Sequence, residues 1–274
     1  MSSFGSRLKH AFEEYGRLCV GIDPHPGMLP EWGLPDDASG LREFGSRVVE
    51  ASVGRVGVVK PQVAFFEAYG VAGMRALAET IAEAKQAGLL VIADAKRGDI
   101  GSTMAAYAEA WLNPEGDFGA DALTVSPFLG FGSLDPAVEA AHRYDAGLFV
   151  LALTSNPEGQ EVQLARTEHG TIAAGIASRA AALNGEAELG SIGLVVGATT
   201  AYLAQANGID LTQGRPPLLA PGYGAQGATA QAMREGFGDA WDQVLVNSSR
   251  DILRRGPEIL ALAEAVDEAR ADVA

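Results

Sequence analysis

Short apolar segments alternate with helical patterns along the whole chain, and this rhythm constrains the fold more than any other feature. The segments are continuously apolar, as in Ile192–Val196, which is the composition of parallel strands buried on both faces. Eight strands, each followed by a helix, predict an α/β fold in which a single (β/α)8 barrel domain spans residues 1–274. The predicted strands are Leu18–Ile22, Val56–Val59, Leu89–Ala93, Ala122–Val125, Leu148–Leu153, Ile192–Val196, Pro217–Ala220 and Gln243–Val246.

An open, doubly wound parallel sheet is the structural alternative. Such sheets usually carry a G-x-G-x-x-G turn after the first strand. Here the first predicted strand ends in Gly21-Ile22-Asp23-Pro24, which does not supply that motif. The closed barrel is therefore the preferred interpretation, and a chain of 274 residues is long enough to bury the core of one such domain.

Helical patterns fill the segments between the strands. Gly88 follows one of them at the position of a left-handed C-cap, and Ser102 or Thr103 is expected to cap the helix after the third strand. The segment His25–Gly40 is expected to be a loop rich in proline and glycine. The predicted helices are Phe4–Tyr15, Leu41–Val53, Gly73–Ala87, Met104–Leu112, Pro136–Arg143, Thr171–Leu183, Thr199–Asn207 and a closing helix after Pro257.

The charge balance narrows the class of partners. The formal net charge is -15 and no cluster of Lys and Arg occurs, which argues against nucleic acid and membrane surfaces as partners. No apolar run approaches the length of a membrane span, and residues 1–17 lack the apolar core of a leader. Cys19, the single cysteine, lies in an apolar strand and fits a buried side chain in a reducing compartment. We expect a soluble cytoplasmic protein.

Charged side chains gather where the third predicted strand ends. Asp94 and Lys96 project from the same side, because successive strand side chains alternate between faces, and Asp99 follows beyond Gly98. Active sites of (β/α)8 barrels lie at the carboxyl ends of the strands. The other strand ends supply further candidates, which are Asp23, Lys60, Ser155, Gln226 and Arg250.

Each of these residues also has a purely structural interpretation. Lys60, Asp94 and Lys96 could form a salt-bridged plug at the barrel mouth, since buried charges are costly unless paired. Asp23 could merely cap the turn before Pro24. The recurrence of polar side chains at one topological level favours a site.

The loops after the last two strands have the composition of a phosphate site. Gly222 and Gly224 permit close approach of the backbone, and Gln226 carries an amide donor. Arg250 can donate two parallel hydrogen bonds to phosphate, and barrels often bind phosphate with these two loops. The alternative is a flexible surface loop and a solvated arginine, and the glycine-rich loop could also serve as a lid.

No metal site is predicted. The four histidines show neither an HxH nor an HExxH spacing, and Cys19 has no partner ligand. A carboxylate-bound Mg2+ is disfavoured because lysines beside Asp94 supply the positive charge that a metal would otherwise bring.

The motifs resemble those of the orotidine 5'-phosphate decarboxylase family, in its longer bacterial branch. Asp94-x-Lys96-x-x-Asp99-Ile100 fits the family's D-x-K-x-x-D signature, and Lys60 ends the preceding strand. Pro221-Gly222-x-Gly224-Ala225-Gln226-Gly227 fits its phosphate loop. The chain departs from compact family members in the long segment His25–Gly40, in Gly101 and in Asn247-Ser248-Ser249 before Arg250.

The resemblance implies a cofactor-free conversion of orotidine 5'-monophosphate to uridine 5'-monophosphate and carbon dioxide in de novo pyrimidine synthesis, at sites shared across a homodimer. It implies that Lys60, Asp94 and Lys96 form a charge array, which Asp99 of the neighbouring subunit completes. The implied substrate contacts are Asp23 and Thr103 of the respective subunits on ribose, Ser155 on the pyrimidine, and Gln226 and Arg250 on phosphate, beside the loop glycines Gly222 and Gly224.

Elementary chemistry agrees with that assignment. Loss of carbon dioxide from C6 of the pyrimidine leaves a localised vinyl carbanion, so catalysis needs fixed positive charge and a nearby proton donor. Lys96 is the candidate for both. Asp94 would lie near the departing carboxylate and would keep the two lysines charged.

Three competing functions remain open from the sequence. A Mg2+-dependent sugar-phosphate decarboxylase or aldolase of the same structural group shares the D-x-K-x-x-D strand, but its second strand characteristically ends in an acidic residue instead of a lysine such as Lys60. A Schiff-base aldolase would need a lysine with a lowered pKa, whereas Asp94 raises the pKa of its neighbours. A non-catalytic nucleotide-phosphate binding protein would have little use for the charge array.

Overall fold

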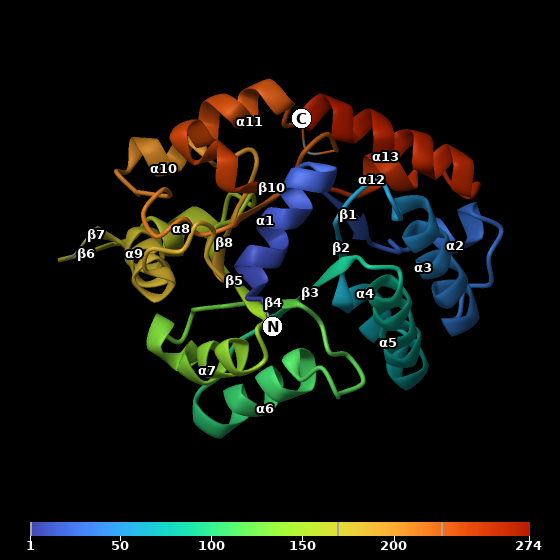
Figure 1. Cartoon of the computed structure of the whole chain (residues 1–274), viewed down its shortest axis with the longest axis horizontal. Coiled ribbons are helices and arrows are strands. Elements are labelled where there is room, and N and C mark those ends of the chain that lie inside the picture. Colours follow the sequence, from blue (N-terminus) through green and yellow to red (C-terminus); the bar gives the residue numbers. More distant parts are fainter. Residues whose placement is uncertain (1, 169, 226) are drawn as a thin grey trace.

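The computed structural model describes residues 2–168, 170–225 and 227–274, and within them eight parallel strands close into a barrel (Figure 1). Around the barrel the strands follow the order β1-β10-β9-β8-β5-β4-β3-β2. The predicted (β/α)8 barrel is therefore confirmed. The strands are β1 (Leu18–Ile22), β2 (Val58–Pro61), β3 (Leu90–Arg97), β4 (Ala122–Val125), β5 (Gly147–Leu153), β8 (Ile192–Val196), β9 (Leu218–Pro221) and β10 (Val244–Ser248).

Helices surround the barrel, and a small hairpin of β6 (Arg166–Thr167) and β7 (Gly170–Thr171) projects from the loop after β5 (Figure 1). The helices are α1 (Phe4–Tyr15), α2 (Met28–Glu31), α3 (Ala38–Ser52), α4 (Val63–Glu67), α5 (Gly70–Gln86), α6 (Gly101–Leu112), α7 (Asp135–Arg143), α8 (Gly159–Gln163), α9 (Ile172–Asn184), α10 (Tyr202–Ala206), α11 (Ala230–Phe237), α12 (Arg250–Leu253) and α13 (Ile259–Val273). No helix in this described part of the chain is both long enough and apolar enough to span a bilayer.

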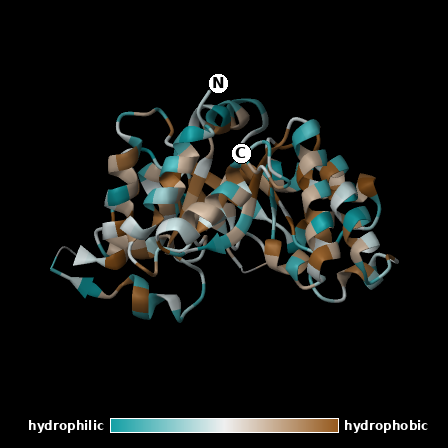
Figure 2. Ribbon diagram, turned by 90° about the horizontal axis from the view of Figure 1, so that it is seen from below, coloured by the Kyte–Doolittle hydropathy of each residue, from teal (hydrophilic) through white to brown (hydrophobic). Residues whose placement is uncertain are grey.

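Apolar side chains form two cores, one between the strands and the helices and a smaller one inside the barrel. On β10, for example, Val244 and Val246 pack outward, whereas Leu245 packs inward with Cys19 of β1 and Phe149 of β5. This alternation explains why the strands read as continuously apolar, since both faces are buried. In Figure 2 apolar residues gather on the central strands, whereas the surrounding helices alternate between apolar and polar residues.

Helix α1 closes the amino-terminal end of the barrel. Its residues Phe4 and Leu8 are fully buried in the inner core, and the Phe4 ring meets Phe149 edge-on with centroids 6.0 Å apart. Gly147 makes room for this plug, because a Cβ there would lie 2.2 Å from the Phe4 ring. Side chains of α1 thus fill the lumen at the amino-terminal end of the barrel, and the lumen is open at the carboxyl ends of the strands.

The boundaries of several predicted elements need correction. Strand β3 continues to Arg97 instead of ending at Ala93, and helix α6 begins at Gly101 instead of Met104. Neither Ser102 nor Thr103 caps that helix, because the earlier start places both inside its first turn. The segment His25–Gly40 is not entirely a loop: it contains α2 and the first turn of α3, whose N-cap is Asp37. Gly88 adopts the predicted left-handed conformation, with φ +85°.

Candidate active site

A cavity of about 600 Å³ opens at the carboxyl end of the barrel. Apolar side chains from the strands, Leu151, Val195 and Leu219, contribute to its lining just above the inner core. Seven of the predicted site residues line it: Asp23, Lys60, Asp94, Lys96, Ser155, Gly222 and Arg250. The structure therefore brings residues from distant parts of the chain together at the level where barrel enzymes keep their active sites.

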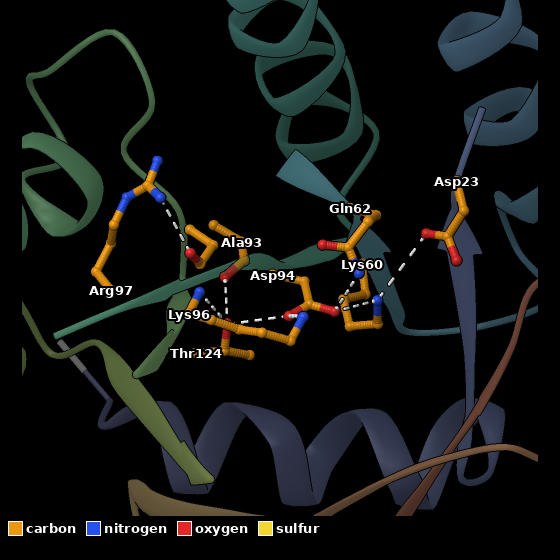
Figure 3. Close-up of polar contacts among 9 residues, drawn as sticks. Asp23, Lys60, Gln62, Ala93, Asp94, Lys96, Arg97 and Thr124 are labelled. Atoms are coloured by element: carbon orange, nitrogen blue, oxygen red, sulfur yellow. Dashed lines mark hydrogen bonds and ion pairs between the residues drawn. The ribbon is translucent and has the colours of Figure 1, made fainter. Parts of the chain in front are cut away.

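Asp94 is the acceptor at the centre of the polar cluster drawn in Figure 3. The ammonium groups of Lys60 and Lys96 donate to its two carboxylate oxygens at 2.8 and 2.5 Å. The amide of Gln62 and the hydroxyl of Thr124 add further hydrogen bonds, both at 3.0 Å. Four donors fix the carboxylate, so its position is set before any ligand arrives.

The alternation of side chains along β2 and β3 points Lys60 and Asp94 into the lumen. Lys60 lies two residues after Val58 on β2 and so points into the lumen above it, and Asp94 lies two residues after Ile92 on β3. A backbone bridge between Gln62 and Asp94 places the amide beside the carboxylate. The predicted shared wall of Asp94 and Lys96 is confirmed.

Burial and pairing set the charges in the cluster. Burial alone would lower the pKa of Lys60, which is 2% exposed, but the carboxylates of Asp94 and Asp23 outweigh it and raise that pKa above its ordinary value. Burial would raise the pKa of Asp94, yet the two lysines hold it well below its ordinary range. Both groups are therefore charged at neutral pH. Lys96 differs from Lys60 because its side chain is 46% exposed toward the cavity.

The β1 side of the cavity carries Asp23 and His25. One carboxylate oxygen of Asp23 lies 4.0 Å from the Lys60 ammonium. The His25 ring packs on Phe65 with centroids 4.6 Å apart, and burial, with Arg250 as a smaller contributor, lowers its pKa despite the opposing effect of Asp23. His25 is thus a neutral imidazole beside the cavity at neutral pH.

The β9 and β10 loops supply the predicted phosphate side. Gly222 and Arg250 line the cavity, and Gly222 adopts φ +108°, which favours glycine. Gly224 faces away from the cavity, toward a second hollow, and a Cβ there would lie 1.9 Å from an Asp251 carboxylate oxygen. Gln226 lies outside the described residues. Only part of the predicted phosphate loop can therefore be placed.

Ser155 follows β5 at the edge of the cavity, in a segment that α8 holds in place. The Gln163 side chain on α8 accepts from the Thr154 backbone N–H at 2.9 Å and donates to the Thr154 hydroxyl at 2.8 Å. This double hydrogen bond ties the short helix to the residue before Ser155. The segment after β5 thus forms one wall of the cavity through Asn156, Val162 and Gln163.

Asp99 and Thr103 do not line the cavity of their own chain. The Asp99 carboxylate accepts from the Ile100 backbone N–H at 2.7 Å, and Thr103 is exposed on the first turn of α6. Two apolar side chains are exposed nearby, Ile100 at 62% and Tyr107 at 36%. The two residues therefore lie on the surface, beside exposed apolar side chains.

Sequence reasoning missed Gln62, Thr124 and Asn247. Asn247 had a detectable signal, because it lies two residues after the inward-facing Leu245 on the same strand and so also faces the lumen. Gln62 and Thr124 had none, since their roles depend on which residues of neighbouring strands face Asp94. Among the described residues, no three His, Cys, Asp or Glu side chains are arranged so that they could hold a metal ion.

Comparison with known proteins assigns the family. Residues 16–265 match the model of the Orotidine 5'-phosphate decarboxylase / HUMPS family. The chain belongs to this family. The matched span contains every predicted site residue from Asp23 to Arg250, and the resemblance read from the D-x-K-x-x-D motif is confirmed.

Full-length relatives support the same assignment. The chain is 54% identical over 270 residues to orotidine 5'-phosphate decarboxylase of Streptomyces coelicolor, covering 97% of this chain and 95% of the relative. It is 53% identical over 274 residues to the enzyme of that name from Salinispora arenicola, covering 99% and 97%. A crystal structure of a protein from Streptomyces avermitilis, titled a putative orotidine 5'-phosphate decarboxylase, superposes with a TM-score of 0.94 at 53% identity and covers 100% of this chain and 95% of that one.

Proposed function

We propose that the chain is an orotidine 5'-phosphate decarboxylase of pyrimidine biosynthesis, which converts orotidine 5'-monophosphate to uridine 5'-monophosphate and carbon dioxide without a cofactor. The observation that carries the proposal is the Lys60–Asp94–Lys96 array at one wall of the cavity. Full-length identity to enzymes of this name supports it. A cytoplasmic location fits an enzyme of this kind.

The cavity offers a separate group for each part of the nucleotide. Arg250, with the backbone at Gly222 and the side chain of Gln226, would bind the phosphate. Asp23 would accept a ribose hydroxyl, and Ser155 would hydrogen-bond the pyrimidine. These contacts would place C6 of the base near Lys96, opposite the phosphate side.

The chemical step uses the exposed ammonium of the array. The bond from C6 to the carboxylate carbon breaks, its electron pair stays on C6, and carbon dioxide leaves. The Lys96 ammonium, 46% exposed in the cavity, would stabilise the developing negative charge and then transfer a proton to C6, after which solvent restores the lysine. Lys60, which is 2% exposed, would contribute a second positive charge at the cavity wall.

Asp94 would act through position and charge. It accepts from both lysines, so it keeps them protonated and separates their ammonium groups by a fixed distance. A substrate carboxylate bound beside this carboxylate would be repelled in the ground state, and that repulsion disappears as carbon dioxide forms. Binding energy from the distant phosphate would offset the repulsion.

A homodimer would complete the site. Asp99 just before α6 and Thr103 in its first turn lie outside the cavity of their own chain, so we propose that the partner subunit's Asp99 and the partner subunit's Thr103 reach this cavity. The Mg2+-dependent alternative is less compatible with the array, because the Lys60 ammonium already occupies the Asp94 oxygen that a cation would need.

The direct test is the loss of orotidine 5'-monophosphate absorbance after adding purified protein pretreated with EDTA, with uridine 5'-monophosphate identified as the product. Rapid loss supports both the reaction and its independence of metal. A folded protein that binds uridine 5'-monophosphate but leaves the substrate unchanged, with or without Mg2+, would refute the proposal.

The shared site has its own test in subunit mixing. Asp99→Ala and Lys96→Ala should each be inactive alone, because each lacks one half of the composite site. After random subunit exchange, one intact site per mixed dimer should restore about a quarter of wild-type activity. Mass-tagged subunits verify the exchange, and no recovery after verified exchange would contradict the shared site.

A further inference from the structure

The pairing of β3 with β4 is interrupted where the catalytic side chains leave the strand. Ala93 pairs with Leu123, and the next registered pair is Arg97 with Val125. Asp94, Ala95 and Lys96 therefore face one residue of β4, Thr124. Asp94 already points into the lumen two residues after Ile92, and the bulge that follows carries Lys96.

The hydroxyl of Thr124 makes two hydrogen bonds across the bulge (Figure 3). The Lys96 backbone N–H, which has lost its ladder position, donates to Thr124 Oγ1 at 2.9 Å. Thr124 Oγ1 lies 3.0 Å from Asp94 Oδ1 and 3.5 Å from the Ala93 carbonyl. The hydroxyl has one proton, and we assign it to the Asp94 carboxylate because this acceptor is nearer than the Ala93 carbonyl and is charged.

The backbone of Lys96 needs this support. Its φ is +48°, a left-handed conformation that costs a residue other than glycine about 1 kcal/mol. Such strain persists only when the surroundings hold it. Thr124 is 1% exposed and connects the strained backbone of Lys96 to the carboxylate that binds its ammonium, so one hydroxyl fixes both ends of that side chain.

We infer that Thr124 is a positioning residue for the decarboxylation, which sets the place of the Lys96 ammonium relative to Asp94 by holding the bulge closed. The inference rests on the proposed function. Thr124 acts through these two residues and does not itself touch the substrate. Its contribution therefore concerns the chemical step, because the groups that would bind phosphate and ribose come from the segments after β1, β9 and β10 and from the partner subunit.

The test compares Thr124→Val, which keeps the shape and removes the hydroxyl, with Thr124→Ser, which keeps the hydroxyl. Wild-type turnover of orotidine 5'-monophosphate is measured first, so that a failure of the proposed function shows itself separately. For Thr124→Val we expect kcat to fall about 10- to 100-fold, while KM and the Kd of uridine 5'-monophosphate stay within about threefold. Thr124→Ser should stay within about threefold of wild type in kcat.

Thr80→Val is the matched control, because Thr80 is also buried and its hydroxyl donates to the Ala76 carbonyl within α5, away from the site. It should leave kcat unchanged. If Thr124→Val does not fold, Thr124→Ala carries the same prediction. The inference is overturned if the variant without the hydroxyl keeps kcat within about twofold of wild type, if Thr124→Ser is equally impaired, or if binding of uridine 5'-monophosphate falls in parallel with kcat.

Discussion

The two sides of the cavity differ in how far their polar groups are satisfied. On the β2–β3 side, Asp94 accepts from four donors, one of which is the buried Lys60 ammonium. On the β10 side, the Asn247 and Ser249 side-chain oxygens are buried without a hydrogen-bond partner among the described residues, and Ser249 stands at the N-cap of α12 without capping it. The array is organised in advance, whereas the phosphate side still has hydrogen bonds to make.

This difference indicates that one side of the site serves the chemical step and the other serves nucleotide binding. Preorganised charge lowers the barrier of the chemical step, because no reorganisation is needed when the carbanion forms. Unsatisfied polar groups cost stability in the free protein and gain partners when an anionic nucleotide binds. Changes on the first side should therefore affect kcat, and changes on the second should affect binding.

Lys96→Ala should have the largest effect. It removes the proposed proton donor, so kcat should fall about 10⁴-fold or more, while uridine 5'-monophosphate binding stays within a few-fold. Stopped-flow assays and calorimetry measure the two quantities. Lys9→Ala, which removes a lysine paired with Glu188 at the opposite end of the barrel, is the control. Near-normal turnover by Lys96→Ala would break the assignment of the charge array.

Arg250→Ala should act on the other side. Loss of charged hydrogen bonds to phosphate should lower kcat/KM about 10- to 100-fold, mainly through KM. Arg254→Ala is the matched control, since Arg254 pairs with Asp251 and its side chain is largely exposed. An Arg250→Ala enzyme with unchanged KM would show that the phosphate binds elsewhere.

Asp94→Asn should lower the free energy of unfolding by an amount that depends on pH, because it removes the charge that pairs with Lys60 and Lys96. The folded-state pKa of Asp94 is lowered, so its stabilisation is complete above its unfolded pKa, near 4, and is lost as pH falls toward the folded value. The folded-state pKa of Lys60 is raised, so its contribution is complete below about pH 10 and is lost above that. Urea unfolding should show a deficit of about 3 kcal/mol that is constant from about pH 5 to 9 and shrinks below about pH 4. A deficit that grows in acid would contradict the pairing.

Asn247→Leu should have the smallest effect on stability and on nucleotide affinity. It tests most directly whether the β10 side of the cavity serves binding. Removing an amide whose buried oxygen has no hydrogen-bond partner should leave the free protein as stable or raise its unfolding free energy by about 1 kcal/mol. The affinity for uridine 5'-monophosphate should fall about threefold, which calorimetry can resolve. A destabilised free protein with intact affinity would mean that Asn247 has a structural role instead.

Much of this molecule follows from local patterns. Outside β3, the predicted strands of the barrel begin and end within two residues of the observed ones, because strands buried on both faces leave an unambiguous apolar signal. The pairing of Asp94 with Lys96 followed from strand alternation. The bulge opposite Thr124 could not be predicted, since it depends on the register between β3 and β4. The early start of α6 was missed because Ser102 and Thr103 resemble N-caps but lie inside the helix.

The inner core also gives the protein a built-in reporter of barrel opening. Cys19, the single cysteine, is fully buried in the lumen, and burial raises the pKa of its thiol to about 12. A thiol reagent can therefore react only when strands separate, because neither access nor thiolate exists in the closed barrel. The labelling rate of the native enzyme, with and without nucleotide, would time how often the barrel opens, with no label or mutation introduced.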